Sequence, residues 1–187
     1  MNTKGSSKIR FVVIEGNDAS GKSTLAAELR STWRAQGWDT KHLGHRPGEQ
    51  FHRYLREYAS ADRLILNRAH VSELVYGRCL RGASPFSETQ LFILDRLVQE
   101  CGLIVYCCPT VEEIQTRLSK RNRTELFPSE PVDVSLLRQV SEEYETVFTG
   151  TCVIRYNPRS AVELDQLIAE LSRLVHGPSL EPGGSRQ

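Results

Sequence analysis

Long hydrophobic runs are missing from this chain of 187 residues. No stretch approaches the roughly 20 apolar residues that a membrane-spanning helix needs. The polar start, MNTKGSSKIR, has no apolar core of the kind found in signal peptides. The sequence therefore predicts a soluble protein with no membrane partner, located in the cytoplasm, or in the host cytoplasm if the protein is viral.

Paired cysteines are missing as well. The five cysteines form no CxxC pair, and Cys107 and Cys108, adjacent on a predicted strand, point to opposite faces of the sheet. These spacings indicate neither a disulfide framework nor a cysteine-bound metal. Reduced, buried cysteines are the simpler interpretation.

Net charge is small, because 24 lysines and arginines balance 23 acids, and the total says nothing about partners. Residues 41–81 are locally basic, with eight lysines and arginines against four acids. This stretch is either a solvated helical surface or a wall that faces phosphates, and the sequence leaves both open. Its basic residues are Lys41, Arg46, Arg53, Arg56, Arg63, Arg68, Arg78 and Arg81.

Internal repeats are absent, and strand-like and helix-like segments alternate along the chain. Strands are predicted at 9–15, 39–44, 62–67, 103–108 and 152–157. Helices are predicted at 23–36, 49–60, 72–80, 84–102, 110–121, 134–148 and 161–175, with Ser87 and Thr110 as N-caps. This order predicts one α/β domain over residues 8–176, with a mainly parallel sheet of about five strands flanked by helices. Residues 177–187, rich in glycine and proline, are predicted to be a disordered tail.

The segment EGNDASGKST, residues 15–24, lies between the first predicted strand and the first predicted helix. Two glycines, 16 and 21, allow successive backbone N–H groups to point into one concavity, and the helix N-terminus adds a partial positive charge. Lys22 can then reach the β- and γ-phosphates of a nucleotide, and the Ser23 hydroxyl can ligate Mg²⁺. The segment predicts a phosphate-binding loop for a nucleoside triphosphate, formed by Gly16, Asn17, Asp18, Ala19, Ser20, Gly21, Lys22, Ser23 and Thr24.

Three other features separate the classes of protein that share such a loop. The Asn-Lys-x-Asp motif of GTPases is absent. The third predicted strand ends in Asn67, where motor ATPases usually carry an acid that holds Mg²⁺. The segment RLSKRNR places Arg117 and Arg121 on one helical face, with Arg123 just beyond. Such a segment is typical of a cationic lid that closes over phosphates in small kinases, and an ordinary exposed helix end is the alternative.

Four segments resemble the thymidylate kinase family of nucleoside and nucleotide kinases. They are FVVIEGNDASGKST at the loop, HRPGEQ after the second strand, NRAHVSELVYG at the end of the third, and RLSKRNR followed by EEYETVF. The resemblance spans about residues 10–175 and is most specific at the loop. It implies a five-stranded P-loop kinase fold, ATP and Mg²⁺ as cofactors, a small-molecule deoxynucleotide acceptor that is commonly a pyrimidine, and a possible homodimer.

The same resemblance implies roles for individual residues. Asp18 is expected to contact the acceptor sugar or the reacting region, Arg46 to approach an acceptor phosphate, and Arg68 to bridge the acceptor and the transferred phosphoryl group. Phe51 or Tyr76 is expected either to stack on the acceptor base or to belong to the core. The catalytic candidates are Lys22, Arg68, Arg117, Arg121 and Arg123.

Asn67 departs from the family pattern, which has an acid at this position. An acceptor phosphate is already an anion and needs little help from a base, whereas a hydroxyl acceptor needs one, for which Glu49 and Asp18 are candidates. The leading hypothesis is transfer of the ATP γ-phosphate to a thymidylate-like pyrimidine deoxynucleotide. The alternative, favoured by Asn67 and the basic stretch, resembles viral kinases that phosphorylate the hydroxymethyl group of hydroxymethyluracil in DNA. A nucleotide-binding protein without catalysis is the third hypothesis.

Overall fold

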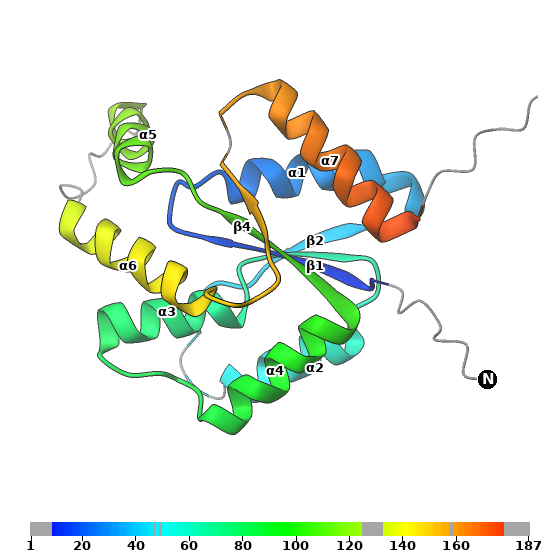
Figure 1. Cartoon of the computed structure of the whole chain (residues 1–187), viewed down its shortest axis with the longest axis horizontal. Helices are drawn as coiled ribbons and strands as arrows, with labels where there is room; N and C mark the ends of the chain where they lie inside the picture. Colours follow the sequence, from blue (N-terminus) through cyan, green and yellow to red (C-terminus); the bar gives the residue numbers. More distant parts are fainter. Residues whose placement is uncertain (1–8, 47, 49, 125–132, 158, 178–187) are drawn as a thin grey trace, which may run out of the picture.

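The computed structural model describes residues 9–46, 48, 50–124, 133–157 and 159–177, and of residues 121–124 it describes the backbone alone. These residues form one sheet with helices on both faces (Figure 1). No helix among them is long and apolar enough to cross a membrane. The predicted tail lies outside the described residues, apart from Gly177.

Five parallel strands form the sheet, in the order β2-β3-β1-β4-β5. The central strand, β1, is buried at all six positions, as expected of an apolar strand that is covered on both faces. Ile14 of β1 pairs in register with Asn67 of β3, so the segments that follow these two strands are neighbours. The strands are β1 (Phe11–Gly16), β2 (Asp39–His42), β3 (Leu64–Asn67), β4 (Gly102–Cys107) and β5 (Ile154–Tyr156).

The helices divide between the two faces of the sheet, which Figure 1 shows from the side. Val12 and Ile14 face a core shared with α1 (Lys22–Trp33) and α7 (Ala161–His176), whereas Phe11 and Val13 face a core shared with four other helices. This alternation is the two-residue period of a strand. The four helices are α2 (Gln50–Ser60), α3 (His70–Arg81), α4 (Glu88–Cys101) and α6 (Val134–Val147).

Side chains cap helices at the positions that the sequence predicts. Ser87 and Gln90 form a capping box at the start of α4. Thr110 and Glu113 make the same pair of bonds at the start of α5 (Val111–Thr124). Each predicted strand and helix is present, and the predicted fold class, a five-stranded parallel α/β sheet flanked by helices, is confirmed.

Both tryptophans lie where α1 and α7 finish, at the opposite end of the sheet from the glycine-rich loop. The rings of Trp33 and Trp38 have centroids 5.0 Å apart, and the His176 ring lies 5.5 Å from that of Trp33. The Trp33 indole N–H also donates to Ser172 Oγ at 2.8 Å. These contacts join the end of α1 to the end of α7.

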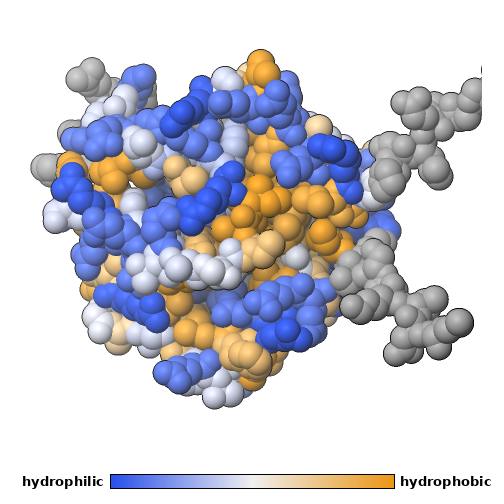
Figure 2. Space-filling view, viewed as in Figure 1, coloured by the Kyte–Doolittle hydropathy of each residue, from blue (hydrophilic) through white to orange (hydrophobic). Residues whose placement is uncertain are grey.

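Hydrophobic residues occupy the middle of one face, between α7 and α4, within hydrophilic surroundings (Figure 2). Large exposed apolar side chains belong to three helices, α3, α4 and α7. The predicted homodimer stays a prediction. The exposed side chains are Leu80, Phe92, Ile93, Val162 and Leu174.

Candidate functional site

The glycine-rich loop joins the end of β1 to the start of α1 and has the backbone of an anion cradle. Gly16, Ala19 and Gly21 all have positive φ, with values of 139°, 56° and 99°. A Cβ on Gly16 would collide with the carbonyl oxygen of Cys107, so this position requires glycine. Gly21 is the N-cap of α1 and supplies no side-chain bond, which leaves the first N–H groups of α1 directed at the loop.

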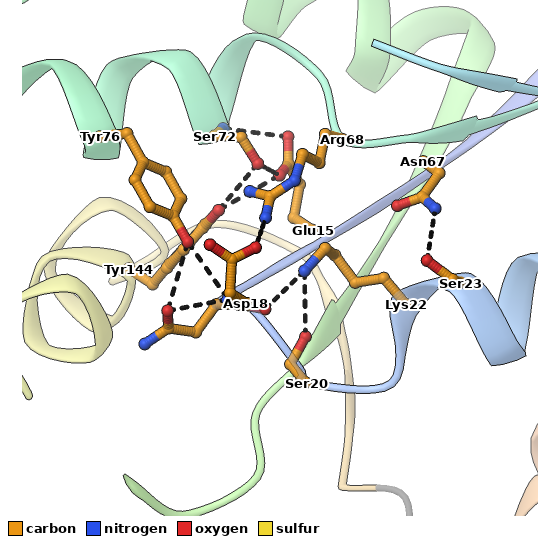
Figure 3. Close-up of polar contacts among 11 residues, drawn as sticks. Glu15, Asp18, Ser20, Lys22, Ser23, Asn67, Arg68, Ser72, Tyr76 and Tyr144 are labelled. Atoms are coloured by element: carbon orange, nitrogen blue, oxygen red, sulfur yellow. Dashed lines mark hydrogen bonds and ion pairs between the residues drawn. The ribbon is translucent and has the colours of Figure 1, made fainter. Parts of the chain in front are cut away.

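Lys22 lies beneath this loop with only 5% of its surface exposed. Its ammonium group donates to the carbonyl oxygen of Asn17 and to Ser20 Oγ (Figure 3). Burial and the positive charge of Arg68 lower the pKa of Lys22 to about 8. A bound phosphate would restore the charged form, because an adjacent anion favours it.

Asp18, Arg68 and Tyr76 form a polar cluster at the other side of the loop (Figure 3). The Arg68 guanidinium pairs with the Asp18 carboxylate and lies 5.1 Å from the centre of the Tyr76 ring. The Tyr76 hydroxyl accepts from the Asp18 backbone N–H at 3.2 Å and donates to Asn17 Oδ1 at 3.2 Å. Asp18 is 60% exposed while Arg68 is 15% exposed, so the carboxylate faces outward and the guanidinium is held behind it.

Asn67 at the end of β3 stands beside Ser23, the first residue after Lys22. Its Nδ2 donates to Ser23 Oγ at 3.1 Å, while its Oδ1 is buried and has no hydrogen-bond partner within the described part of the chain. Ser23 Oγ and Asn67 Oδ1 therefore both lie at the loop, and the second has no hydrogen-bond partner among the described residues. Oxygen ligands and ordered water are what Mg²⁺ prefers, so these two residues fit the ion.

A cavity of about 800 Å³ opens between these groups. A second cavity of about 520 Å³ runs between α1 and β2 and shares Ser23, His42 and Asn67 with the first. A third, of about 230 Å³, lies between α1 and the segment before α7 and includes Tyr156 and Arg159. The first cavity is lined by Asp18, Ala19, Ser20, Gly21, Lys22, Ser23, Thr24, His42, Asn67, Arg68 and Arg117.

The predicted site residues separate into three groups. The structure brings together the loop residues, Arg68, Tyr76 and Arg117, whose guanidinium donates to the Ala19 carbonyl oxygen at 3.3 Å. It does not bring Arg46 or Phe51 to this cavity, since Arg46 is exposed and Phe51 packs against the core. Glu49 and the side chains of Arg121 and Arg123 lie outside the described residues.

Most of the basic stretch at 41–81 makes internal contacts. Lys41 pairs with Glu57, Arg78 with Glu143 and Arg81 with Glu73. Arg53 donates to the Gly44 carbonyl oxygen and Arg63 to that of Gln36. Of the eight basic residues, Arg68 alone lines the larger cavity. The stretch is therefore not a continuous wall of cations facing phosphates.

Three buried polar residues near the site were not predicted as functional. Glu15 is fully buried directly before Gly16 and binds the start of α3. On α2, Gln50 is 6% exposed, and neither its amide nor the Tyr54 hydroxyl has a partner among the residues described. Burial, followed by the charges of Glu73 and Glu15, raises the pKa of Tyr54. Buried polar groups without partners are rare in proteins, and a missing ligand is one explanation.

Comparisons with solved structures find the same fold in other proteins. The YorR protein of Bacillus subtilis, in complex with phosphorylated GDP, matches with a TM-score of 0.71 and 20% identity, over 89% of this chain and 95% of that chain. Deoxyadenosine kinase of M. mycoides with bound dCTP matches with a TM-score of 0.55 and 13% identity, over 87% and 98%. No family model matches, and a search of curated proteins gives no match. At these identities the likeness shows the fold alone.

Proposed function

We propose that this chain is an ATP-dependent phosphotransferase that transfers the γ-phosphate to a thymidylate-like pyrimidine deoxynucleotide. The observation that carries the proposal is the placement of Lys22 and Arg68 on one 800 Å³ cavity, at the carboxyl ends of β1 and β3. Lys22 belongs to the phosphate-binding loop, and Arg68 lines the cavity from the end of β3. A phosphoryl group between them would be neutralised from both directions.

The donor end is formed by the loop and the start of α1. The backbone N–H groups of residues 16–24 would hold the phosphates, and Lys22 would leave the Asn17 carbonyl oxygen to bind them. Mg²⁺, when bound, would neutralise charge on the phosphate oxygens. Ser23 Oγ and Asn67 Oδ1 would hold the ion or its water molecules.

The acceptor end is formed by Asp18, Arg68 and Tyr76. Arg68 would exchange part of its contact with Asp18 for an acceptor phosphate oxygen, which its fork of donors fits. An acceptor oxygen then bonds to the γ-phosphorus while the bond to the bridging oxygen of ADP breaks. Gln50 on α2 does not line the cavity, but its unpartnered amide offers the donor and acceptor that a pyrimidine edge matches, and we propose it as the contact for the base.

The ligands of two neighbours with this fold support the class of substrate. YorR is in complex with phosphorylated GDP and deoxyadenosine kinase has bound dCTP, and both of these ligands are nucleotides. No base is required when the acceptor is a phosphate, and Asn67 at the end of β3 is compatible with such an acceptor.

One observation favours the alternative acceptor, hydroxymethyluracil in DNA. The second cavity, beside α1 and β2, shares the lining residues Ser23, His42 and Asn67 with the first. Arg30, Arg34 and Lys41 line it, although Arg30 pairs with Asp39 and Lys41 with Glu57. A polymer acceptor has neighbouring phosphates that could occupy this cavity, whereas a mononucleotide has none.

Transfer of label from γ-labelled ATP tests these functions directly. The purified chain is incubated with thymidylate, thymidine, or DNA that contains hydroxymethyluracil, and Lys22→Ala serves as the inactive control. Label on thymidylate supports the proposal, with an apparent affinity that depends weakly on salt. Label on DNA, with an affinity that falls steeply as salt rises, replaces it by the alternative. Binding of ATP without label on any acceptor would leave a nucleotide-binding protein.

A further inference from the structure

Glu15, the residue before Gly16, carries a carboxyl group that is buried in the protein core. Its exposed fraction is 0%. Oε1 accepts from the backbone N–H of Ala69 at 2.9 Å and of Ser72 at 3.2 Å. Oε2 accepts from the Ser72 hydroxyl (Figure 3). Burying a carboxyl group is costly unless it is hydrogen-bonded, and these bonds satisfy it. All of them reach the start of α3.

The start of α3 has no cap of its own. Its N-cap residue is Ala69, which has no polar side chain, and no side-chain cap bond is made from that position. In a capping box, one side chain binds the N–H of the third helical residue and another binds the N–H of the N-cap. Ser72 and Ala69 occupy these two positions, so Glu15 makes both bonds from another strand.

Arg68 stands directly before this capped end, in a strained conformation. Its φ is 69°, in the left-handed region that residues other than glycine rarely adopt. Its N–H donates to the Ile14 carbonyl oxygen at 3.0 Å, and the next N–H, of Ala69, donates to Glu15. Two successive residues of β1 therefore hold the two successive amides that place the Arg68 guanidinium on the cavity.

A third element is tied to the same carboxyl group. The Tyr144 hydroxyl of α6 lies 2.8 Å from Ser72 Oγ and 3.5 Å from Glu15 Oε2. Asn17, on the other side of Gly16, donates to the Leu137 carbonyl oxygen of α6 at 3.0 Å. The side chains that flank Gly16 thus connect the phosphate loop to α3 and α6 together.

We propose that Glu15 is a positioning residue that sets Arg68 relative to the phosphate loop by capping α3 from β1. It does not touch the cavity, because it is absent from the cavity lining and fully buried. Its effect on phosphoryl transfer passes through the backbone of residues 68 and 69. The kinetic part of this inference rests on the proposed function, whereas the structural part does not.

Replacing Glu15 by glutamine or alanine tests the kinetic part. Glutamine keeps an oxygen for the two backbone N–H groups, so Glu15→Gln should lower kcat less than Glu15→Ala, which should lose about tenfold to a hundredfold. The affinity for ATP, measured by direct binding, should stay within about twofold of the original protein. Ser87→Ala removes an equivalent cap from α4, away from the site, and should leave kcat unchanged. A parallel fall in ATP affinity would assign Glu15 to the phosphate loop and overturn the inference.

A double-mutant cycle distinguishes positioning from a general loss of structure. If Glu15 acts through Arg68, Glu15→Gln should lower kcat in the original protein but add little in the Arg68→Ala background. Equal losses in both backgrounds would contradict the inference. Should Glu15→Ala fail to fold, Glu15→Gln and Ser72→Ala carry the same test; the serine variant removes the hydroxyl's bonds to Glu15 and Tyr144 and keeps the backbone N–H bond to Glu15.

Hydrogen exchange provides a readout that does not need activity. The amides of Ala69 and Ser72 should exchange faster in Glu15→Gln, and faster still in Glu15→Ala, than in the original protein, while those of α4 remain unchanged. This result would support the cap even if no acceptor were ever phosphorylated. Unchanged exchange at both amides would overturn the cap, whatever the enzyme does with ATP.

Discussion

Lys22 is a buried amine whose charged form an adjacent anion would stabilise. Its pKa of about 8 reflects burial and the nearby Arg68. In the unfolded chain the pKa of the same amine has its ordinary value of about 10.5. Between these two values the unfolded chain holds more protons at this site, so the contribution of Lys22 to folding stability rises from pH 8 to pH 10.5 and is least favourable below pH 8.

Binding of ATP should therefore be linked to proton uptake at Lys22. The phosphates favour the charged amine, so its pKa rises in the complex, and affinity should fall by about tenfold per pH unit above pH 8. Calorimetry at pH 7 and pH 9, in buffers of different ionisation enthalpy, measures both the affinity for ATP and the number of protons taken up on binding. Lys22→Ala should lose the pH dependence together with most of the affinity. An affinity that is flat from pH 7 to pH 9 would contradict the lowered pKa.

Asn67 is expected to influence metal use more than chemistry. A carboxylate at this position would attract Mg²⁺ more strongly than an amide oxygen does, so Asn67→Asp should reach half-maximal rate at lower Mg²⁺ with kcat changed by less than about tenfold. Rate against Mg²⁺ concentration is the measurement. Asn157 also has a buried Oδ1 without a partner in the described chain, and Asn157→Asp is the matched control. Loss of all activity in Asn67→Asp would mean that the N–H donated to Ser23 is essential.

At the scale of elements, α2 carries Gln50, the residue proposed to contact the acceptor base. Gln50→Leu removes an amide that has no partner in the part of the chain described, so stability should not fall. If Gln50 binds the base, kcat/KM for the preferred nucleotide should drop by about tenfold to a hundredfold, mostly through KM, and preference among bases should weaken. Gln99→Leu on α4, an exposed position, is the control. If Gln50→Leu is more stable and its preference among bases is unchanged, Gln50 is a buried polar residue without a role in base recognition.

Helix α5 is expected to contribute charge during transfer. Arg117 lines the cavity and is within reach of the loop, so Arg117→Ala should lower kcat by about tenfold to a thousandfold, with a smaller loss of ATP affinity. Single-turnover rates and direct binding separate the two effects. Arg96→Ala, an exposed arginine paired with Glu100 on α4, should behave like the original protein. If Arg117→Ala is kinetically silent, α5 is a solvated helix rather than a lid.

Local signals in the sequence predict the elements better than the contacts between them. Ser87 caps a helix through Gln90, three residues away, and such patterns can be recognised from spacing alone. Glu15 instead bonds to Ala69 and Ser72, which are 54 and 57 residues away, and the sequence predicts only that it ends the first strand. Arg78 likewise pairs with Glu143, at a separation of 65 residues. These partners depend on the packing of α3 and α6, which periodicity does not specify.

For the molecule as a whole, the order of strands determines where the site forms. The chain leaves β1 toward β2 and β3 on one side, and β4 and β5 are added on the other side. In open parallel sheets the crevice at such a reversal, beyond the carboxyl ends of the strands, is where ligands bind. The loop after β1 and the Arg68 turn after β3 meet there. The resemblance to thymidylate kinases implied a five-stranded P-loop fold, and the structure adds the order of the strands.

The tryptophan cluster at the far end of α1 has a consequence for spectroscopy. Trp33 lies 11 residues along α1 from Lys22, which is roughly 16 Å at 1.5 Å per residue. Both indoles are nearly fully buried against α7, so intrinsic fluorescence should shift strongly to the red on unfolding and change little when ATP binds. Titration of ATP into the protein, followed by urea denaturation, would check both statements. A large change in fluorescence on nucleotide addition would mean that α1 transmits loop movements along its whole length. A small change would mean that tryptophan fluorescence reports unfolding of this protein without interference from its ligand.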